Sequence, residues 1–401
     1  ITDIDDKINA AAKQNNESIT TLTERFTQAC IEDFEALGVA PPDVRPKATE
    51  HIPEIIDMIE NLIEGGFAYE SEGHVLFHVP RDPSYGSLSK RSLEDMLAGA
   101  RVEIASYKKD PKDFILWKPS SSDLPGWDSP WGRGRPGWHI ECSAMIQKHL
   151  GGHIDIHGGG SDLTFPHHEN EAAQSRCANR SEDYVNYWLH NGMITLANEK
   201  MSKSLGNILG IRTLLQQHSG EVLRYALLSG HYRSSLSWSD DLIQQAKSSL
   251  DSLYQTLRDH SEKALLGSVP IGSSLECDHE FELALCDDLN TPKALAALHR
   301  ISDELRNAED DESALRKRND LIQAGSLLGL LQDDPEAYFK RSIGSETGDA
   351  LSESKIESLI EERNQARAER NFDLADQIRQ SLLEKGIELE DQRTGTRWRR
   401  I

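Results

Sequence analysis

The sequence is short of positive charge, of paired cysteines and of long apolar runs. Its 44 Lys and Arg residues stand against 67 Asp and Glu, a formal net charge of −23, so a nucleic acid could be bound only through local basic patches. Its five cysteines form no CxxC pair, which favours a reducing, cytoplasmic compartment. No apolar run approaches the roughly 18 residues of a membrane helix, so no membrane partner is expected.

The chain also lacks a starting methionine. Its first four residues alternate like the end of a strand, and a helix is predicted to begin at Asp5. We therefore expect that further sequence precedes Ile1 in the complete protein.

The length predicts two or three domains, and the patterning predicts that they differ in type. Apolar residues recur at helical spacing over residues 49–66, and alternation over residues 67–79 around a Ser-Glu-Gly turn predicts a hairpin. From Arg212 onward strand patterns vanish. Helical spacing then covers residues 242–257, 280–305, 312–331 and 353–386. The front is therefore predicted to be α/β and the back all-α, with the best linker at residues 344–349.

A glycine-rich segment follows a short alternating run at residues 153–156. Because residues 158–160 are all glycine, a flat ring or a sugar can approach the backbone, and the Asp162 carboxylate can accept hydrogen bonds from ribose hydroxyls. A plain glycine turn explains the three glycines equally well. The flanking His157 and Asp162 favour nucleotide binding.

A possible metal site follows directly. His167 and Glu171 stand four residues apart after Pro166, which suits the first turn of a helix, so their side chains are predicted to share one helical face. With the upstream Cys142 they make a mixed set of ligands typical of zinc. On spacing alone, a surface His–Glu hydrogen bond and a small buried cysteine are the commoner interpretation. Both interpretations remain open at this point.

Residues 199–207 carry two lysines, Lys200 and Lys203, on a segment that also contains Ser and Gly. Two ammonium groups at this spacing can clamp a triphosphate and neutralise the charge that develops when its α-phosphate is attacked. For two lysines three residues apart and nothing else, a solvated basic loop is the usual interpretation.

Together these segments resemble one known family. Residues 200–204 read Lys-Met-Ser-Lys-Ser, which is similar to the KMSKS loop of class I aminoacyl-tRNA synthetases, and their neighbours narrow the resemblance to cysteinyl-tRNA synthetases. The supporting segments are residues 2–7, 137–145, 157–171, 188–193, 229–234 and 395–400. They follow the family's order along the whole chain.

The resemblance implies an α/β fold in which a Rossmann-type catalytic domain is followed by α-helical tRNA-binding domains. The implied domains are a catalytic domain at residues 1–211 with an inserted connective segment at about 40–130, a stem-contact region at 212–245, a helical bundle at 246–343 and a C-terminal anticodon-binding domain at 350–401.

The resemblance also implies the reaction. Members of the family are monomers that join L-cysteine to tRNA(Cys) through a cysteinyl-adenylate, using ATP with Mg²⁺. They hold one zinc ion (Zn²⁺) through two Cys, one His and one Glu, of which three match Cys142, His167 and Glu171. The zinc binds the thiolate of the cysteine substrate. This contact matters because shape alone lets an enzyme prefer one substrate over a near-isostere, such as cysteine over serine, by only roughly 10- to 200-fold.

Further roles carry over from the family by position. Thr2, Trp138 and His157 match positions that line the amino-acid pocket, and Lys200 and Lys203 match the catalytic lysines. The implied ATP-binding residues are His157, Gly159, Asp162, Lys200, Met201, Ser202, Lys203 and Ser204. The implied tRNA-binding residues are Arg393, Arg397, Trp398, Arg399 and Arg400. In this basic patch we expect the indole to stack on a base, although a charged, frayed terminus is the common alternative.

One hallmark of the family is missing. No HIGH tetrapeptide occurs in the 401 residues, and in the family this motif, the first strand and the fourth zinc ligand all precede the position of Thr2. We expect a fragment that is inactive by itself, and the alternative is a degenerate, catalytically dead paralogue that binds tRNA or has a regulatory role. A related ligase joins cysteine to an amino sugar but lacks an anticodon domain, so residues 352–401 argue against it.

Overall fold

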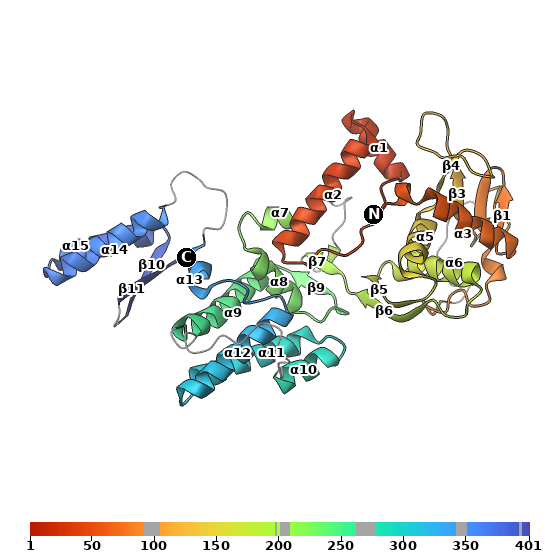
Figure 1. The fold of residues 1–401 in the computed structure, drawn as a ribbon. Coiled ribbons are helices and arrows are strands. Elements are labelled where there is room, and N and C mark those ends of the chain that lie inside the picture. Colours follow the sequence, from red (N-terminus) through yellow and green to blue (C-terminus); the bar gives the residue numbers. More distant parts are fainter. Residues whose placement is uncertain (92–104, 197–198, 201–208, 262–277, 342–350, 393–394) are drawn as a thin grey trace. The chain divides into compact units, whose positions relative to one another are not determined.

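The computed structural model describes residues 1–91, 105–196, 199–200, 209–261, 278–341, 351–392 and 395–401 (Figure 1). The chain folds into two compact units. The first comprises residues 1–32 and 40–193, and the second comprises residues 33–39 and 194–401. Each unit has its own hydrophobic core. The predicted linker at residues 344–349 lies outside the described residues.

The first unit contains a four-stranded antiparallel sheet. Its strands, in spatial order, are β1 (Ala68–Ser71), β2 (His74–Phe77), β3 (Phe114–Pro119) and β4 (Gly134–Pro136). The hairpin predicted at residues 67–79 is confirmed, because Glu72 and Gly73 make its turn with φ angles of 51° and 73°. The predicted helix at residues 49–66 is confirmed as α3 (Ile52–Glu64), whose apolar face joins the same core as the sheet.

The first unit also contains a β–α–β segment. Strands β5 (Ile154–Gly160) and β6 (Val185–Asn191) pair in parallel and are connected by a π-helical turn, η3 (Thr164–His168), and by α6 (Glu169–Asn179). Helix α5 (Trp138–Leu150) follows β4 closely and packs on α6. The three glycines do not form a turn after residue 156. They extend β5, because residues 158–160 pair with residues 189–191 of β6.

The chain starts as an extended segment. Residues 1–5 join no strand of the described chain, and the Ile1 backbone instead bonds to Pro46 and Ala48. Helix α1 (Asp6–Asn15) begins one residue later than predicted, because the Asp5 side chain caps it by accepting the amide of Lys7 at 2.8 Å. Helix α2 (Ile19–Ala36) and two short 3₁₀ turns, η1 (Ala48–Glu50) and η2 (Val79–Arg81), complete this part of the chain.

Helices form the core of the second unit. They are α7 (Ile211–Leu214), α8 (Gly220–Leu228), α9 (Asp240–Asp259), α10 (His279–Cys286), α11 (Thr291–Arg306), α12 (Asp311–Leu327) and α13 (Pro335–Lys340). The helix predicted at residues 280–305 is in fact two, α10 and α11. The break occurs because Asp288 and Leu289 both take a φ of 54°. No helix of the described residues is long and apolar enough to span a membrane.

The expectation that strands vanish after Arg212 is wrong. Strand β9 (Leu236–Trp238) pairs in parallel with β7 (Ile194–Leu196), which also pairs with β8 (Glu199–Lys200). At the C-terminus, α14 (Glu353–Ala368) and α15 (Phe372–Glu384) precede a hairpin of β10 (Ile387–Gln392) and β11 (Gly395–Arg400). Leu389 and Trp398 face each other across this hairpin in a small apolar core. The strand of Trp398 was not predicted, because the arginines on both sides of it leave only one apolar residue in the segment and no clear alternation.

Candidate functional site

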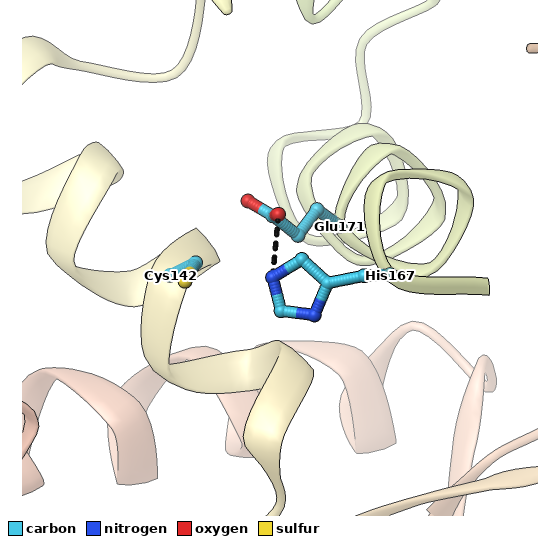
Figure 2. Close-up of side chains that lie close together, drawn as sticks. All are labelled: Cys142, His167 and Glu171. Carbon is cyan, nitrogen blue, oxygen red and sulfur yellow. Dashed lines mark ion pairs between the residues drawn. The ribbon is translucent and has the colours of Figure 1, made fainter. Parts of the chain in front are cut away.

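The three predicted metal ligands lie close together in the first unit (Figure 2). Cys142 comes from α5, His167 from η3 and Glu171 from α6. His167 Nε2 lies 3.0 Å from Glu171 Oε1, and the possible ligand atoms of the three residues all lie within 4.8 Å of one another. His167 lies in the π-helical turn ahead of α6, yet the spacing of four residues still brings it to Glu171.

The surroundings of these side chains favour a bound cation. Glu171 is 1% exposed, and its Oε2 atom has no hydrogen-bond partner among the described residues. Burial, with a contribution from the Glu171 and Glu141 carboxylates, raises the pKa of the Cys142 thiol. A cation would offset both costs by stabilising the thiolate and contacting the free carboxylate oxygen. One sulfur, one nitrogen and one oxygen donor fit zinc.

A second group shares Glu171. The possible ligand atoms of His157, His168 and Glu171 also lie within 4.8 Å of one another, and His157 Nε2 is 3.7 Å from Glu171 Oε1. Burial, with smaller effects from neighbouring histidines, lowers the pKa of His168 to about 3. This second group contains no thiolate.

The ring of another histidine, His139, contacts the ring of His167. The Nδ1 atoms of His139 and His167 are 2.8 Å apart. Burial lowers the pKa of His139 to about 3, so its ring is neutral at pH 7. His139 is not among the predicted site residues, because nothing in its sequence position shows which side chain it contacts.

The residues predicted to line the amino-acid pocket lie around the same cluster. The Thr2 hydroxyl donates to Glu141 Oε2 at 3.0 Å, next to Cys142 in sequence. The Trp138 ring is 48% exposed and lies 4.2 Å from the His167 ring. The His157 ring lies 4.5 Å from the ring of His168, which in turn neighbours His167. The structure thus brings Trp138 and His157 beside the three candidate ligands, and it places Thr2 against Glu141, the neighbour of Cys142 in the sequence.

Glu141 is a site residue that the sequence did not reveal. Its side chain is 1% exposed, and burial raises its pKa to about 8. Together with Trp138 and His139 it lines a cavity of about 300 Å³. Only the approach of Thr2 in the folded chain identifies Glu141 as part of the site.

The predicted ATP-binding residues are only partly described. Gly159 lies in β5, where a Cβ atom would come within 2.7 Å of His168 Cε1, and Asp162 follows the carboxyl end of the strand. Lys200 ends β8, and its side chain is not described. Met201, Ser202, Lys203 and Ser204 lie outside the described residues.

The predicted tRNA-binding patch is engaged in contacts within the chain. Arg397 pairs with Glu336 and Asp259, and Arg399 pairs with Glu388. The Arg400 guanidinium donates to the backbone carbonyls of Lys340 and Leu351. Arg393 lies outside the described residues.

The expectation that Trp398 stacks on a base needs correction. Trp398 is 3% exposed and belongs to the C-terminal apolar core. Its ring is therefore a packing element in this structure, with no exposed face for a nucleobase.

Known families and folds match this architecture. Residues 1–248 match the family described as tRNA synthetases class I (C) catalytic domain, and residues 280–332 match the DALR domain. The fold is similar to that of methionyl-tRNA synthetase from Mycobacterium tuberculosis in complex with methionyl-adenylate, with a TM-score of 0.56 and 15% identity over 80% of this chain and 79% of that chain. The fold is also similar to that of a putative arginyl-tRNA synthetase from Campylobacter jejuni, with a TM-score of 0.50 and 15% identity. That match covers 79% of this chain and 70% of the other. The chain is therefore a class I tRNA synthetase.

Sequence relatives narrow this class to one family. The cysteine–tRNA ligases of Xanthomonas campestris pv. campestris and Saccharophagus degradans are each 54% identical to the chain, over 400 and 401 residues. The enzyme of Paramagnetospirillum magneticum is 53% identical over 403 residues. Each alignment covers 100% of this chain and 85% of the relative. The chain belongs to the cysteine–tRNA ligase family, whose members attach cysteine to tRNA.

Proposed function

We propose that the enzyme activates cysteine as a cysteinyl-adenylate and selects it with a zinc ion held by Cys142, His167 and Glu171. In this reaction the carboxylate of cysteine attacks the α-phosphate of Mg²⁺-bound ATP and pyrophosphate leaves. A hydroxyl of the terminal ribose of the tRNA then takes the cysteinyl group and AMP leaves. The observation that carries the zinc proposal is the close grouping of Cys142 with the buried His167 and Glu171, together with the Glu171 Oε2 atom, which has no hydrogen-bond partner in the described part of the chain.

The triad suits the discrimination that this reaction needs. When bound, zinc supplies a soft Lewis acid that favours a thiol over the hydroxyl of serine. The chain's own residues orient the amino acid: Thr2 is fixed through Glu141, and Trp138 and His157 lie beside the triad. Water is excluded by burial, since His167 and Glu171 are 5% and 1% exposed.

The nucleotide is proposed to lie at the carboxyl end of β5. Ligands of parallel α/β sheets bind beyond the carboxyl ends of the strands; Gly159 is close to the carboxyl end of β5, and Asp162 lies just beyond it. We assign the phosphates to Lys200 and Lys203, because positive charge next to a transferring phosphoryl group stabilises its transition state. The tRNA is assigned to the second unit and the enzyme to a monomer, as the family resemblance implies.

The zinc proposal predicts that Cys142→Ser lowers both the zinc content of the protein and its preference for cysteine over serine. Zinc is measured by metal analysis, and selectivity by pyrophosphate exchange with either amino acid. Cys177→Ser is the control, because Cys177 is also a free thiol but lies buried in the apolar core, on α6. Unchanged selectivity in Cys142→Ser would remove zinc from amino-acid recognition.

A further inference from the structure

We infer that His139 is a positioning residue for the metal site, which holds the His167 ring in the one tautomer and orientation that turn its Nε2 atom toward Glu171. The inference rests on the zinc site proposed above and adds a residue that contacts a ligand. The juxtaposition that carries it is the 2.8 Å approach of the two Nδ1 atoms.

The hydrogen bond between the two rings has only one direction that suits a metal ligand. His167 uses Nε2 toward Glu171 Oε1, at 3.0 Å, so Nε2 is its ligand atom. A coordinating ring nitrogen carries no proton, so the proton of His167 must lie on Nδ1. His167 Nδ1–H then donates to His139 Nδ1, which accepts. Ligand histidines usually donate their second N–H in this way, and the partner fixes the ring.

His139 is itself held firmly enough to serve as such a partner. The Gln174 side chain donates to the His139 carbonyl at 3.0 Å and to Ser143 Oγ at 2.8 Å, which ties the first turn of α5 to α6. The Phe114 ring of β3 meets the His139 ring edge-on, with centroids 5.8 Å apart. The backbone of His139 is therefore fixed and its ring packs against Phe114, and the hydrogen bond between the two imidazoles passes this constraint to His167.

The other histidine group offers a built-in comparison. His168 Nδ1 lies 2.8 Å from His190 Nε2, so a second histidine pair of equal length supports the group of His157, His168 and Glu171. If the metal bound there, His190 would be the supporting residue. The thiol of Cys142 belongs only to the first group, which favours His139.

The experiment measures the affinity of the protein for Zn²⁺ alone, by competition with a chromophoric chelator. We expect His139→Ala to weaken binding by roughly 10- to 100-fold, the usual effect of losing the partner of a ligand histidine. His139→Asn should bind nearly as well as the wild type, because its amide oxygen can replace Nδ1 as acceptor. His190→Ala should bind like the wild type. Wild-type affinity in His139→Ala, or a loss confined to His190→Ala, would overturn the inference.

Two further measurements separate positioning from general damage. If His139→Asn loses as much affinity as His139→Ala, the side chain acts by packing and the inference fails. With Co²⁺ as the probe, His139→Ala at saturation should keep the thiolate-to-cobalt absorption band of Cys142, and absence of that band would also overturn the inference. Cys142→Ser tests the zinc site itself, and wild-type zinc affinity in that variant would refute the site. If Cys142→Ser binds zinc weakly but His139→Ala binds it normally, only the role of His139 is refuted.

Discussion

At the scale of single residues, the site depends on a close approach between two backbones. A Cβ atom at Gly137 would lie 2.1 Å from the carbonyl oxygen of Ile115. That oxygen belongs to the backbone of β3, so it cannot move aside without shifting the strand. Gly137 immediately precedes Trp138 and caps the helix that carries Cys142. The absence of a side chain at one residue therefore sets where α5 begins.

This approach predicts that Gly137→Ala destabilises the protein by about 1–3 kcal/mol, the usual cost of overfilling a packed site. Zinc affinity should fall as well, because α5 must shift with its cysteine. Chemical denaturation and zinc titration measure the two effects. Gly158→Ala is the matched control, since its Cβ would meet only the Leu189 carbonyl oxygen, at 3.7 Å. Equal losses in the two variants would show that the approach to Ile115 does not matter.

Residues of the site differed in how well the sequence revealed them. The spacing of His167 and Glu171 was sufficient to predict their contact, because residues four apart meet on a helical surface. Cys142 lies on another helix, so the sequence pattern could only suggest it as a third ligand, and the family resemblance then supplied the match. The roles of His139 and Glu141 were invisible, since packing rather than spacing chooses the partner of a buried polar side chain.

At the scale of elements, helices were predicted better than short strands. Long apolar periodicities located α3, α9 and α12 within a few residues. Strand β9 has only three residues and is a strand because it pairs with β7. A local sequence pattern cannot predict such a pairing. The two strands of the C-terminal hairpin were not predicted, because its one aromatic residue, Trp398, is flanked by arginines and the sequence there shows no clear apolar alternation.

An ion pair joins that hairpin to helix α14. The Arg363 guanidinium of α14 donates to both carboxylate oxygens of Asp391 in β10, each at 2.8 Å. The Arg363 side chain is 4% exposed. Its hydrogen bonds hold the pKa of Asp391 well below the ordinary value of 3.8. Since the folded-state pKa is the lower one, the pair contributes stability above that ordinary value and loses it as the pH falls toward the folded-state pKa.

We therefore predict that the stability difference between wild type and Asp391→Asn is largest at neutral pH and narrows below about pH 4. Urea denaturation of the protein, followed by its tryptophan fluorescence, to which the buried Trp398 contributes, measures this difference across the pH range. Asp287→Asn serves as the control, because Asp287 pairs with Lys293 at an exposed position and should change little at any pH. A difference for Asp391→Asn that stays constant with pH would contradict the assignment.

At the scale of the whole molecule, distant parts of the second unit meet at one arginine. The side chain of Arg258, near the end of α9, is fully buried. It donates to both carboxylate oxygens of Glu336 in α13, each at 2.9 Å, to Glu390 of β10 and to the carbonyl of Trp398 in β11. Arg397 also pairs with Glu336. Charges that resembled an RNA-binding tail in the sequence thus contribute to holding the C-terminal hairpin against α9 and α13.

The last prediction follows from this junction. Arg258→Ala leaves the carboxylates of Glu336 and Glu390 without their shared partner, and breaking a buried pair typically costs about 3–5 kcal/mol. Because both glutamates keep some solvent contact, we expect the lower end of that range. The loss should be local: backbone amides of β10 and β11 should exchange hydrogen faster, while those of α11 keep their protection.

Arg258→Lys should give an intermediate effect, because an ammonium group keeps the charge but cannot form the two-pronged contact with Glu336. Arg300→Ala is the matched control: Arg300 pairs with Asp278, Glu280 and Glu304, all within the helical bundle. It should therefore affect exchange in α10 and α11 and leave the hairpin unchanged. If the hairpin responds equally to Arg258→Ala and Arg300→Ala, its attachment depends on the stability of the bundle as a whole and not on the buried guanidinium.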